Sequence, residues 1–251
     1  MALLRCDVYS ACLGMETTVQ VVLPDKGAVS DARLVYLLHG LTDNSTAWQR
    51  YSRAESYAAQ YGAALVCPEV QRSFYTDMYA GANYFTYITE ELPAICRRLF
   101  GVTQDANKTY VMGLSMGGYG ALKAALRFPQ QYAGCAAFSA VTDVKALFAS
   151  NLQQLHTQRE DAAIFGPTLL PPPEDELFAL VENAILQKKM PRTFLCCGSE
   201  DSLVDMNRRF RDTITALGGK AAYCEWPGTH NWEFWDEALR QAFAFHFTEK
   251  P

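Results

Sequence analysis

The sequence predicts an α/β fold in which a mostly parallel sheet is covered by helices on both faces. Short apolar runs alternate with longer stretches of helical periodicity along most of the chain, and this alternation is typical of strand–helix–strand units. Several of the runs are almost continuously apolar, as strands buried on both faces are. A chain of 251 residues is long enough for one large domain with a substantial core.

The expected strands begin near the N-terminus with two β-rich segments, 3–9 and 17–23. The second of these is β-branched and ends at Pro24, as a strand does. The apolar run 34–38 is the first strand expected to be buried on both faces. The remaining strands are expected at 63–67, 109–112, 135–138, 193–197 and 221–224.

Helices are expected between these strands, and Pro93 should kink one of them or start a turn, because proline lacks an N–H group. Their predicted ranges are 45–61, 84–100, 116–128, 203–217 and 232–247.

The segment 142–190 interrupts the alternation and contains Gly166-Pro167 and three consecutive prolines. We expect it to be a cap or lid insertion with its own helices over one end of the sheet, within a single domain spanning 1–251. The alternative is an ordinary helix with an elaborated loop.

Composition excludes several classes of protein. Apolar residues make up 49% and charged residues 20%, which excludes intrinsic disorder. The net charge is −5 and no basic stretch occurs, so we expect no nucleic-acid partner. No apolar run approaches about 18 residues, so we expect no membrane span. Neither a metal nor a cofactor is expected, and homo-oligomers remain open.

The eight cysteines are expected to be reduced thiols. Most lie in apolar runs or a helical pattern, and none has C-x-x-C or zinc-site spacing. The N-terminal residues 1–7 carry charges where a signal peptide has an apolar core. A cytoplasmic location is the expectation from these two observations.

A G-x-S-x-G motif spans residues 113–117 and centres on Ser115. It follows the apolar run 109–112 and opens a helix rich in small residues. A serine on such a strand-to-helix turn is pushed out at the carboxyl edge of the sheet, and the flanking glycines allow close backbone approach. The positive end of the helix favours a developing oxyanion. Ser115 is therefore the candidate nucleophile.

A serine nucleophile needs a base, and the chain offers four histidines. His230 lies in a loop after the last expected strand and before the last helix. This is where the base that serves a serine on a strand-to-helix turn is expected. His39 precedes the serine and is expected to hold its own loop by hydrogen bonds. His156 lies in the suspected cap. His246 lies in the final helix as a packing or surface residue.

The base needs an orienting acid, which should follow the preceding strand. Asp201 is the candidate, because it comes after 193–197 and before the next helix. Glu200, Asp205 and Asp175 are rivals. An aspartate at this position could instead act only as a helix N-cap.

An oxyanion hole needs two backbone N–H donors. One is expected from Met116, the residue after the nucleophile, and the other from the loop after an early strand. Leu41 is the first choice in that loop and Gly40 the second. The candidate lining of the substrate pocket is Gly40 with the aromatic residues Trp48, Tyr119 and Trp232, although these rings could instead pack between helices and sheet.

Four blocks together resemble the esterase D-like branch of the α/β-hydrolases, and within it the tributyrin esterases and the feruloyl and acetyl esterases. The blocks are 39–44 (HGLTDN), 113–122 (GLSMGGYGAL), 198–201 (GSED) and 228–235 (GTHNWEFW). The resemblance runs from about residue 3 to 247 and is weakest in 142–190. It implies the same triad, Ser115, Asp201 and His230, and the same oxyanion donors, Leu41 and Met116.

The expected function is a serine carboxylesterase that hydrolyses small-molecule esters of short-chain or hydroxycinnamoyl acids through an acyl-enzyme. The alternative is a thioesterase like S-formylglutathione hydrolase, or an acyltransferase, with the same triad. S-formylglutathione hydrolases usually carry a cysteine near the oxyanion loop, where this chain has Asp43 after Thr42. A catalytically silent scaffold is a third hypothesis, but it would need none of the triad residues.

Overall fold

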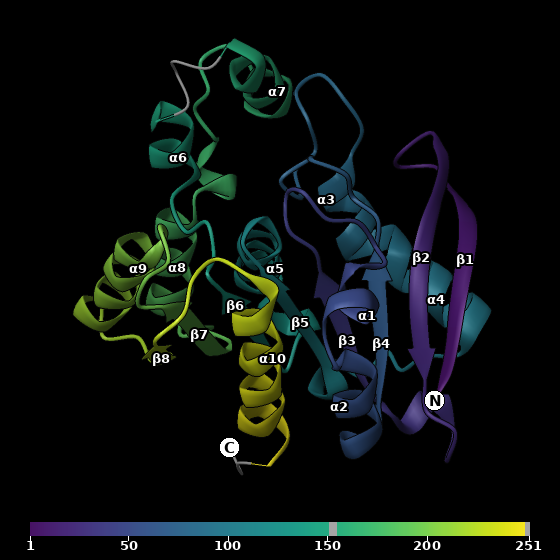
Figure 1. Cartoon of the computed structure of the whole chain (residues 1–251). Coiled ribbons are helices and arrows are strands. Elements are labelled where there is room, and N and C mark those ends of the chain that lie inside the picture. Colours follow the sequence, from purple (N-terminus) through teal and green to yellow (C-terminus); the bar gives the residue numbers. More distant parts are fainter. Residues whose placement is uncertain (151–154, 249–251) are drawn as a thin grey trace.

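The structure, a computed structural model, describes residues 1–150 and 155–248 (Figure 1). One sheet of eight strands runs through this part of the chain in the order β1-β2-β4-β3-β5-β6-β7-β8. β1 and β2 pair antiparallel, and β2 pairs antiparallel with β4, whereas all pairs from β4 to β8 are parallel. The bounds are β1 Ala2–Ser10, β2 Met15–Leu23, β3 Arg33–Leu38, β4 Ala63–Pro68, β5 Thr109–Leu114, β6 Gly134–Phe138, β7 Arg192–Gly198 and β8 Ala222–Trp226.

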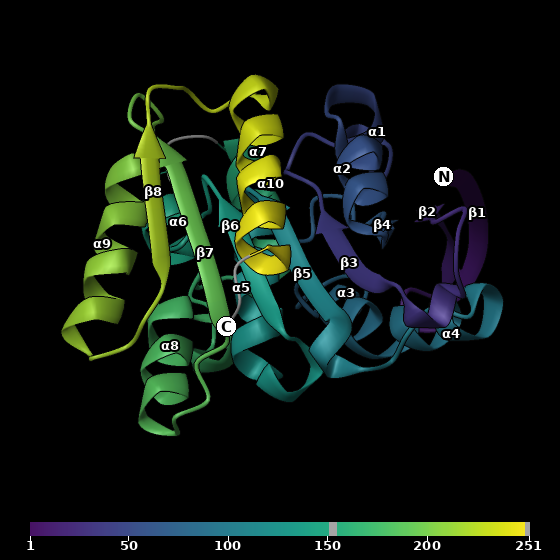
Figure 2. The ribbon, with the colours of Figure 1, turned by 90° about the horizontal axis from the view of Figure 1, so that it is seen from below.

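Helices cover both faces of the sheet (Figure 2). One face carries α1 (Ala47–Tyr51), α2 (Ala54–Tyr61) and α10 (Trp232–Phe247). The other face carries α3 (Tyr84–Thr86), α4 (Leu92–Phe100), α5 (Met116–Arg127), α8 (Leu177–Leu186) and α9 (Val204–Ala216). Each layer buries its own apolar core against the sheet. The predicted mostly parallel sheet with helices on both faces is confirmed.

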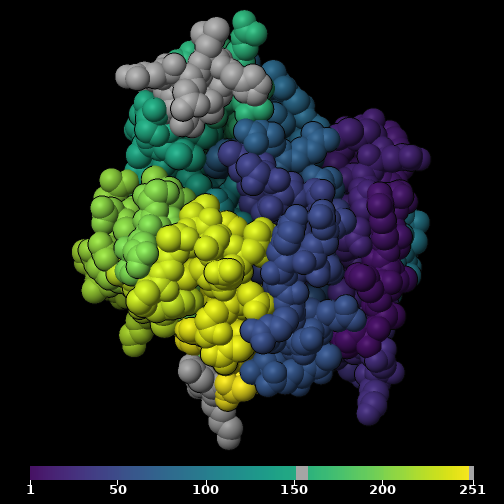
Figure 3. All heavy atoms as spheres, in the orientation of Figure 1, coloured from purple at the N-terminus to yellow at the C-terminus, as the bar shows by residue number. Residues whose placement is uncertain are grey.

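On the face with α10, the last helix lies directly against the first two (Figure 3). The rings of Tyr57 on α2 and Phe243 on α10 lie 6.5 Å apart, centroid to centroid. This contact joins segments from opposite ends of the sequence.

Two predicted helices are interrupted for local chemical reasons. The helix expected at 45–61 is divided into α1 and α2 at Ser52, whose backbone is extended. The Ser52 hydroxyl donates to Trp48 O and accepts from the Ala54 N–H, so it replaces helical backbone bonds with its own. The helix expected at 84–100 contains a π-helical turn, Tyr87–Glu91, just before Pro93 at the second position of α4. Proline has no N–H to continue the regular ladder across that point.

The described part of the segment 142–190 contains helices in two different places, and the assignment of a cap or lid stays a prediction. Its last helix, α8, packs on α5 and connects to β7 as an ordinary crossover helix. Its first two helices, α6 (Val144–Ser150) and α7 (Leu155–Phe165), lie beyond the carboxyl ends of the strands (Figure 1). We call α6 and α7 the cap helices. The side chain of His156 lies outside the described residues.

All eight cysteines are free thiols in the structure. Among the described helices, none combines the length and the apolar character needed to cross a bilayer.

His246 gives the fold a predicted sensitivity to acid. Its ring is buried in α10, where Nε2 donates to Cys135 O at 3.1 Å. Burial lowers the pKa of His246 to about 4, and the nearby Arg192 adds to that effect against the opposing hydrogen bond. An unfolded histidine has a pKa of about 6.5. Between these values the unfolded chain takes up a proton that the folded chain does not, so stability falls as the pH drops from about 6.5 to about 4.

His246→Phe should remove the part of the acid destabilisation that is due to His246. We expect the free energy of unfolding of the unmodified protein to fall by about 2–3 kcal/mol more than that of the variant between pH 7 and pH 4.5. Urea unfolding of both proteins at the two pH values measures it. An equal acid loss in both would show that other groups cause the acid sensitivity.

Candidate active site

Ser115 lies at the sharp turn between β5 and α5, where it is the residue that precedes the helix. Its backbone adopts φ 52° and ψ −117°, which is a costly conformation for a residue with a side chain. The turn is held by a hydrogen bond from the Ser115 N–H to Phe138 O at 2.8 Å. This strained elbow presents the hydroxyl at the carboxyl edge of the sheet.

The two glycines of the motif are required by close backbone contacts. A Cβ atom on Gly113 would lie 2.3 Å from Gly117 O, and one on Gly117 would lie 2.3 Å from Leu38 O. Neither position can hold a side chain without moving backbone. The absence of side chains lets α5 approach the end of β3, and the loop that follows β3 therefore lies beside Ser115.

The imidazole of His230 lies between Ser115 and Asp201. Its Nε2 is 3.0 Å from Ser115 Oγ, and its Nδ1 is 2.9 Å from Asp201 Oδ2. The ring is one-third exposed and meets the edge of the Trp235 ring at 4.8 Å. His230 occupies the loop between β8 and α10, and α10 is capped by Asn231 Oδ1, which accepts from the Phe234 N–H.

Asp201 is buried beside His230, and its surroundings favour the ionised carboxylate. Burial alone would raise the pKa of its carboxyl, but hydrogen bonds from His230 and from the Leu203 N–H lower it below its ordinary value. The Leu203 N–H donates to Oδ1 at 2.8 Å, and His230 Nδ1 lies 2.9 Å from Oδ2 and 3.1 Å from Oδ1. The carboxylate therefore fixes the imidazole with Nδ1 protonated and Nε2 free to accept the serine proton.

The three rival acids lie elsewhere. Glu200 is exposed. Asp205 pairs with Arg208 on the surface of α9, and Asp175 pairs with the buried Lys123 at 2.6 Å. Of the acidic residues considered from sequence, the structure brings only Asp201 to His230.

The two candidate N–H donors in the loop after β3 differ in their hydrogen bonding. The Gly40 N–H donates to Asp43 Oδ2 at 3.2 Å, so it is occupied. Within the described residues, neither the Leu41 N–H nor the Met116 N–H has a hydrogen-bond acceptor. This difference favours Leu41 over Gly40 as the second oxyanion donor.

His39 fixes the direction of the Leu41 N–H. His39 Nδ1 donates to Gly40 O at 2.8 Å, and Nε2 accepts from the Val70 N–H at 3.2 Å. In a trans peptide the C=O and N–H groups point in opposite directions. By holding Gly40 O, His39 turns the N–H of the same peptide group, that of Leu41, to the other side.

The four residues predicted to line the pocket differ in how deeply they are buried and in what they contact. Gly40 lies against the Ser115 side chain, since a Cβ there would be 3.8 Å from Ser115 Cβ. Trp232 is half-buried and packs its ring 5.4 Å from that of Tyr51. Trp48 and Tyr119 are completely buried.

The prediction that Trp48 and Tyr119 line the pocket needs correction, because each has its polar atom satisfied inside the core. Trp48 Nε1 donates to Leu38 O at 3.2 Å, and Tyr119 OH donates to Asp175 O at 2.7 Å. Both are core residues that support the site from behind.

A cavity of about 230 Å³ lies between the loop after β3 and the cap helices. Sequence analysis did not assign most of its lining, which is Leu41, Arg72, Phe74, Leu147, Phe148, Glu160, Asp161 and Ile164. Leu41 belongs both to this cavity and to the candidate oxyanion loop, so the cavity reaches the loop that lies beside Ser115. No sequence signal near the motifs indicates the lining residues on α6 and α7, because only the fold brings them there.

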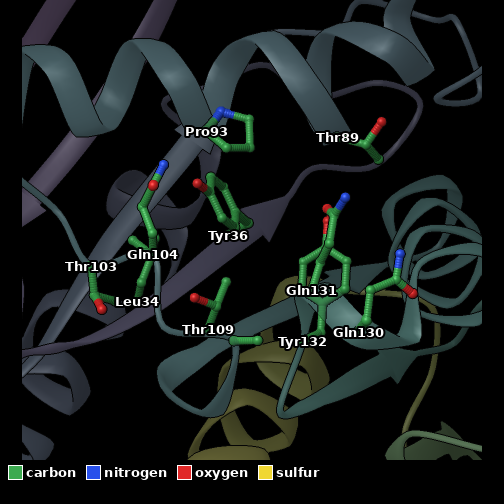
Figure 4. A pocket seen from close by; sticks show the side chains of 11 residues that line it. Leu34, Tyr36, Thr89, Pro93, Thr103, Gln104, Thr109, Gln130, Gln131 and Tyr132 are labelled. Atoms are coloured by element: carbon green, nitrogen blue, oxygen red, sulfur yellow. The ribbon is translucent and has the colours of Figure 1, made fainter.

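A second cavity, about 300 Å³, lies at the other end of the sheet (Figure 4). Leu34 and Thr109, which pair near the beginnings of β3 and β5, form part of its wall together with Tyr36, Gln104 and Gln131. None of its 11 lining residues is charged and none belongs to the candidate triad. Among the described residues, no group of three or more His, Cys, Asp or Glu side chains is placed to hold a metal ion.

Fold and site together define a serine hydrolase of the α/β-hydrolase fold. The family described as “Putative esterase” matches residues 10–246. The chain belongs to this esterase family and is a carboxylic ester hydrolase.

Individual relatives match over nearly the whole chain. An acetyl esterase of Caldicellulosiruptor saccharolyticus is 29% identical over 264 residues, which cover 97% of each chain. The solved structure of a substrate-bound fluorophosphonate-binding serine hydrolase F of Staphylococcus aureus has a TM-score of 0.89 at 27% identity, with 99% of each chain covered. An S-formylglutathione hydrolase of the same organism has a TM-score of 0.87 at 28% identity, with 98% of each covered.

Proposed function

We propose that the chain is a serine carboxylesterase that hydrolyses esters of short-chain acids through an acyl-enzyme on Ser115. The observation that carries the proposal is the continuous hydrogen-bonded series from Asp201 through His230 to Ser115, with distances of 2.9 and 3.0 Å. These are the distances at which a base can take a proton from a nucleophile.

The proposed reaction uses each of these groups in turn. His230 Nε2 takes the Ser115 proton as Oγ attacks the ester carbonyl carbon, and the resulting oxyanion accepts from the Leu41 and Met116 N–H groups. The alcohol then leaves with the proton from His230, which forms the acyl-enzyme. A water molecule repeats the two steps, and the acid leaves with Ser115 restored.

The cavity beside Leu41 supports the proposed substrate class. We assign the acyl group to it, because apolar residues make up most of its lining besides Arg72, Glu160 and Asp161. These apolar residues are Leu41 and Phe74, together with Leu147, Phe148 and Ile164 of the cap helices. A volume of about 230 Å³ is below the range of pockets for drug-sized ligands. It favours acetyl to butanoyl groups over hydroxycinnamoyl groups, which remain the second part of the proposal.

Thioester hydrolysis or acyl transfer with the same triad is the alternative. It is favoured by the likeness to an S-formylglutathione hydrolase, because the two chains align over their whole lengths. Asp43 counts against this alternative, because S-formylglutathione hydrolases usually carry a cysteine near this loop. Here the Asp43 carboxylate accepts the Gly40 N–H and so helps to hold the loop.

A panel of p-nitrophenyl acetate, butanoate and octanoate, together with methyl ferulate and S-formylglutathione, tests the proposal. We expect kcat/KM for the acetate and butanoate to exceed that for the octanoate by at least about tenfold, since each misplaced methylene in a closed pocket costs about 1–3 kcal/mol. Added alcohol should not divert more than a minor share of product to a new ester.

Three outcomes would contradict parts of this assignment. Preference for the octanoate would contradict the acyl cavity. A kcat/KM for S-formylglutathione well above that of all oxygen esters would favour the thioesterase, and dominant ester formation with added alcohol would favour the acyltransferase.

A further inference from the structure

Arg72 connects the cap helices to the candidate oxyanion loop. Its guanidinium binds Glu160 on α7 through two nitrogens, with Nε 3.1 Å from Oε1 and Nη2 2.8 Å from Oε2. The remaining nitrogen, Nη1, donates to Leu41 O at 3.4 Å. The planar fork of arginine makes a bidentate pair with a carboxylate and still has donors for a third group.

The two carbonyl groups on either side of the Leu41 N–H are therefore both held. His39 holds Gly40 O from inside the core, and Arg72 holds Leu41 O from the side of the cap. His39 is almost fully buried, whereas the Arg72 side chain is 45% exposed and Glu160 is 32% exposed. Only the Arg72 contact therefore changes if α7 moves.

The position of α7 is also tied to the loop that carries Arg72. The Tyr79 and Ala80 N–H groups donate to Ile164 O and Ala163 O at 3.0 and 2.9 Å. Arg72 and these two residues thus hold α7 near its middle and at its end. Ile164 lines the acyl cavity, so an acyl group that fills the cavity contacts the same helix that Arg72 grips.

We propose that Arg72 is a positioning residue that couples α7 to the oxyanion hole. Through Arg72, the position of the cap helices over the acyl group sets the direction of the Leu41 N–H. This inference rests on the proposed function. Arg72 touches no reacting atom; it acts through Leu41. Its loss misdirects one of two donors, and a misplacement of about 1 Å in a catalytic group is enough to cost up to about 100-fold in rate.

Acetate and butanoate esters, assayed with Arg72→Ala, Arg72→Lys, Glu160→Gln and the double variant Arg72→Ala/Glu160→Gln, test the coupling. An acetyl group fills less of the acyl cavity than a butanoyl group does, so kcat for the acetate depends least on contacts with the cap helices. It therefore measures mainly the state of the oxyanion hole. We expect Arg72→Ala to lower kcat for the acetate about tenfold with KM within about twofold, a smaller loss than removal of a whole oxyanion donor. Arg72→Lys should recover only part of the kcat that Arg72→Ala loses, because an ammonium group cannot reproduce the bidentate pair with Glu160 and also bind Leu41 O.

The double variant separates coupling from two independent effects. Glu160→Gln should lower kcat less than Arg72→Ala, and the double variant should be no slower than Arg72→Ala alone. The rate of Ser115 phosphorylation by diethyl p-nitrophenyl phosphate should fall in parallel with kcat, since that reaction also uses the hole. Arg208→Ala is the matched control, because Arg208 on α9 forms a similar bidentate pair with Glu225 on β8, outside the cap helices and the loop after β3, and its kcat should be unchanged.

Two results would overturn the coupling. If Arg72→Ala keeps kcat for the acetate within twofold of the unmodified protein, or changes only KM, then Arg72 is merely a cap contact. If the single losses add fully in the double variant, the two residues act separately. Failure of the proposed function is distinguishable from both, because the unmodified protein would then react with the phosphate ester at a residue other than Ser115.

Discussion

Ser115→Ala is expected to lower kcat for p-nitrophenyl acetate by about 10⁴-fold or more. The variant cannot form the acyl-enzyme, and the oxyanion donors alone leave only slow attack by water. The hydroxyl makes its one side-chain contact with His230, so the fold should not change. Steady-state kinetics and a thermal unfolding curve of the same preparation measure both expectations.

The control for Ser115→Ala is a serine away from the site. Ser30 is exposed in the short turn Val29–Asp31, which precedes β3. Ser30→Ala should keep the full activity, as surface substitutions away from the site have small effects. Full activity in Ser115→Ala would show that the ester is hydrolysed elsewhere on the molecule.

Asp201→Asn is the second large effect, with an expected loss of up to about 10⁴-fold in kcat. The Leu203 N–H donates to Oδ1, so it holds the amide oxygen of the asparagine at that position. The amide NH₂ group then takes the position of Oδ2, which is the oxygen nearer to His230 Nδ1, at 2.9 Å against 3.1 Å for Oδ1. Donation from this NH₂ group to Nδ1 favours the tautomer with the proton on Nε2, in which the base cannot take the serine proton.

Glu200→Gln is the matched control, because Glu200 is the adjacent carboxylate and is exposed. Its kcat should stay within about twofold of the unmodified protein, as surface substitutions away from the site have small effects. If Glu200→Gln were the more damaging change, the acid would be misassigned. The tautomer argument would also be contradicted if kcat/KM rose with pH in Asp201→Asn in the same way as in the unmodified protein.

The strands and the triad were predictable because both depend on local sequence. Strands buried on both faces are nearly all apolar, and the runs that predicted β3 to β7 are such strands. Ser115, Asp201 and His230 each follow a strand, and parallel strands bring their carboxyl ends to one edge. The order along the chain was therefore enough to predict which residues meet.

The remaining features depend on side chains whose partners are distant in sequence. The Ser52 hydroxyl divides a helix whose periodicity continues across it. The aromatic character of Trp48 and Tyr119 did not distinguish a pocket wall from a core, because rings with a polar atom suit both. Whether such a ring is buried depends on its partner, which for Tyr119 is a carbonyl 56 residues away.

Arg72 and Glu160 show the same limit at the site itself. They are 88 residues apart, and neither lies in a motif. An arginine and a glutamate in polar surroundings indicate a surface, and their pairing follows only from the path of the cap helices. Sequence therefore predicted the groups proposed to do the chemistry, and the structure was needed for the groups proposed to hold them.

Mass spectrometry of the protein after reaction with diethyl p-nitrophenyl phosphate tests the central claim most directly. We expect one diethylphosphoryl group per chain, located on Ser115, with activity lost in proportion to its incorporation and no adduct in Ser115→Ala. Incorporation at another residue, or full activity in a protein phosphorylated at Ser115, would contradict the account.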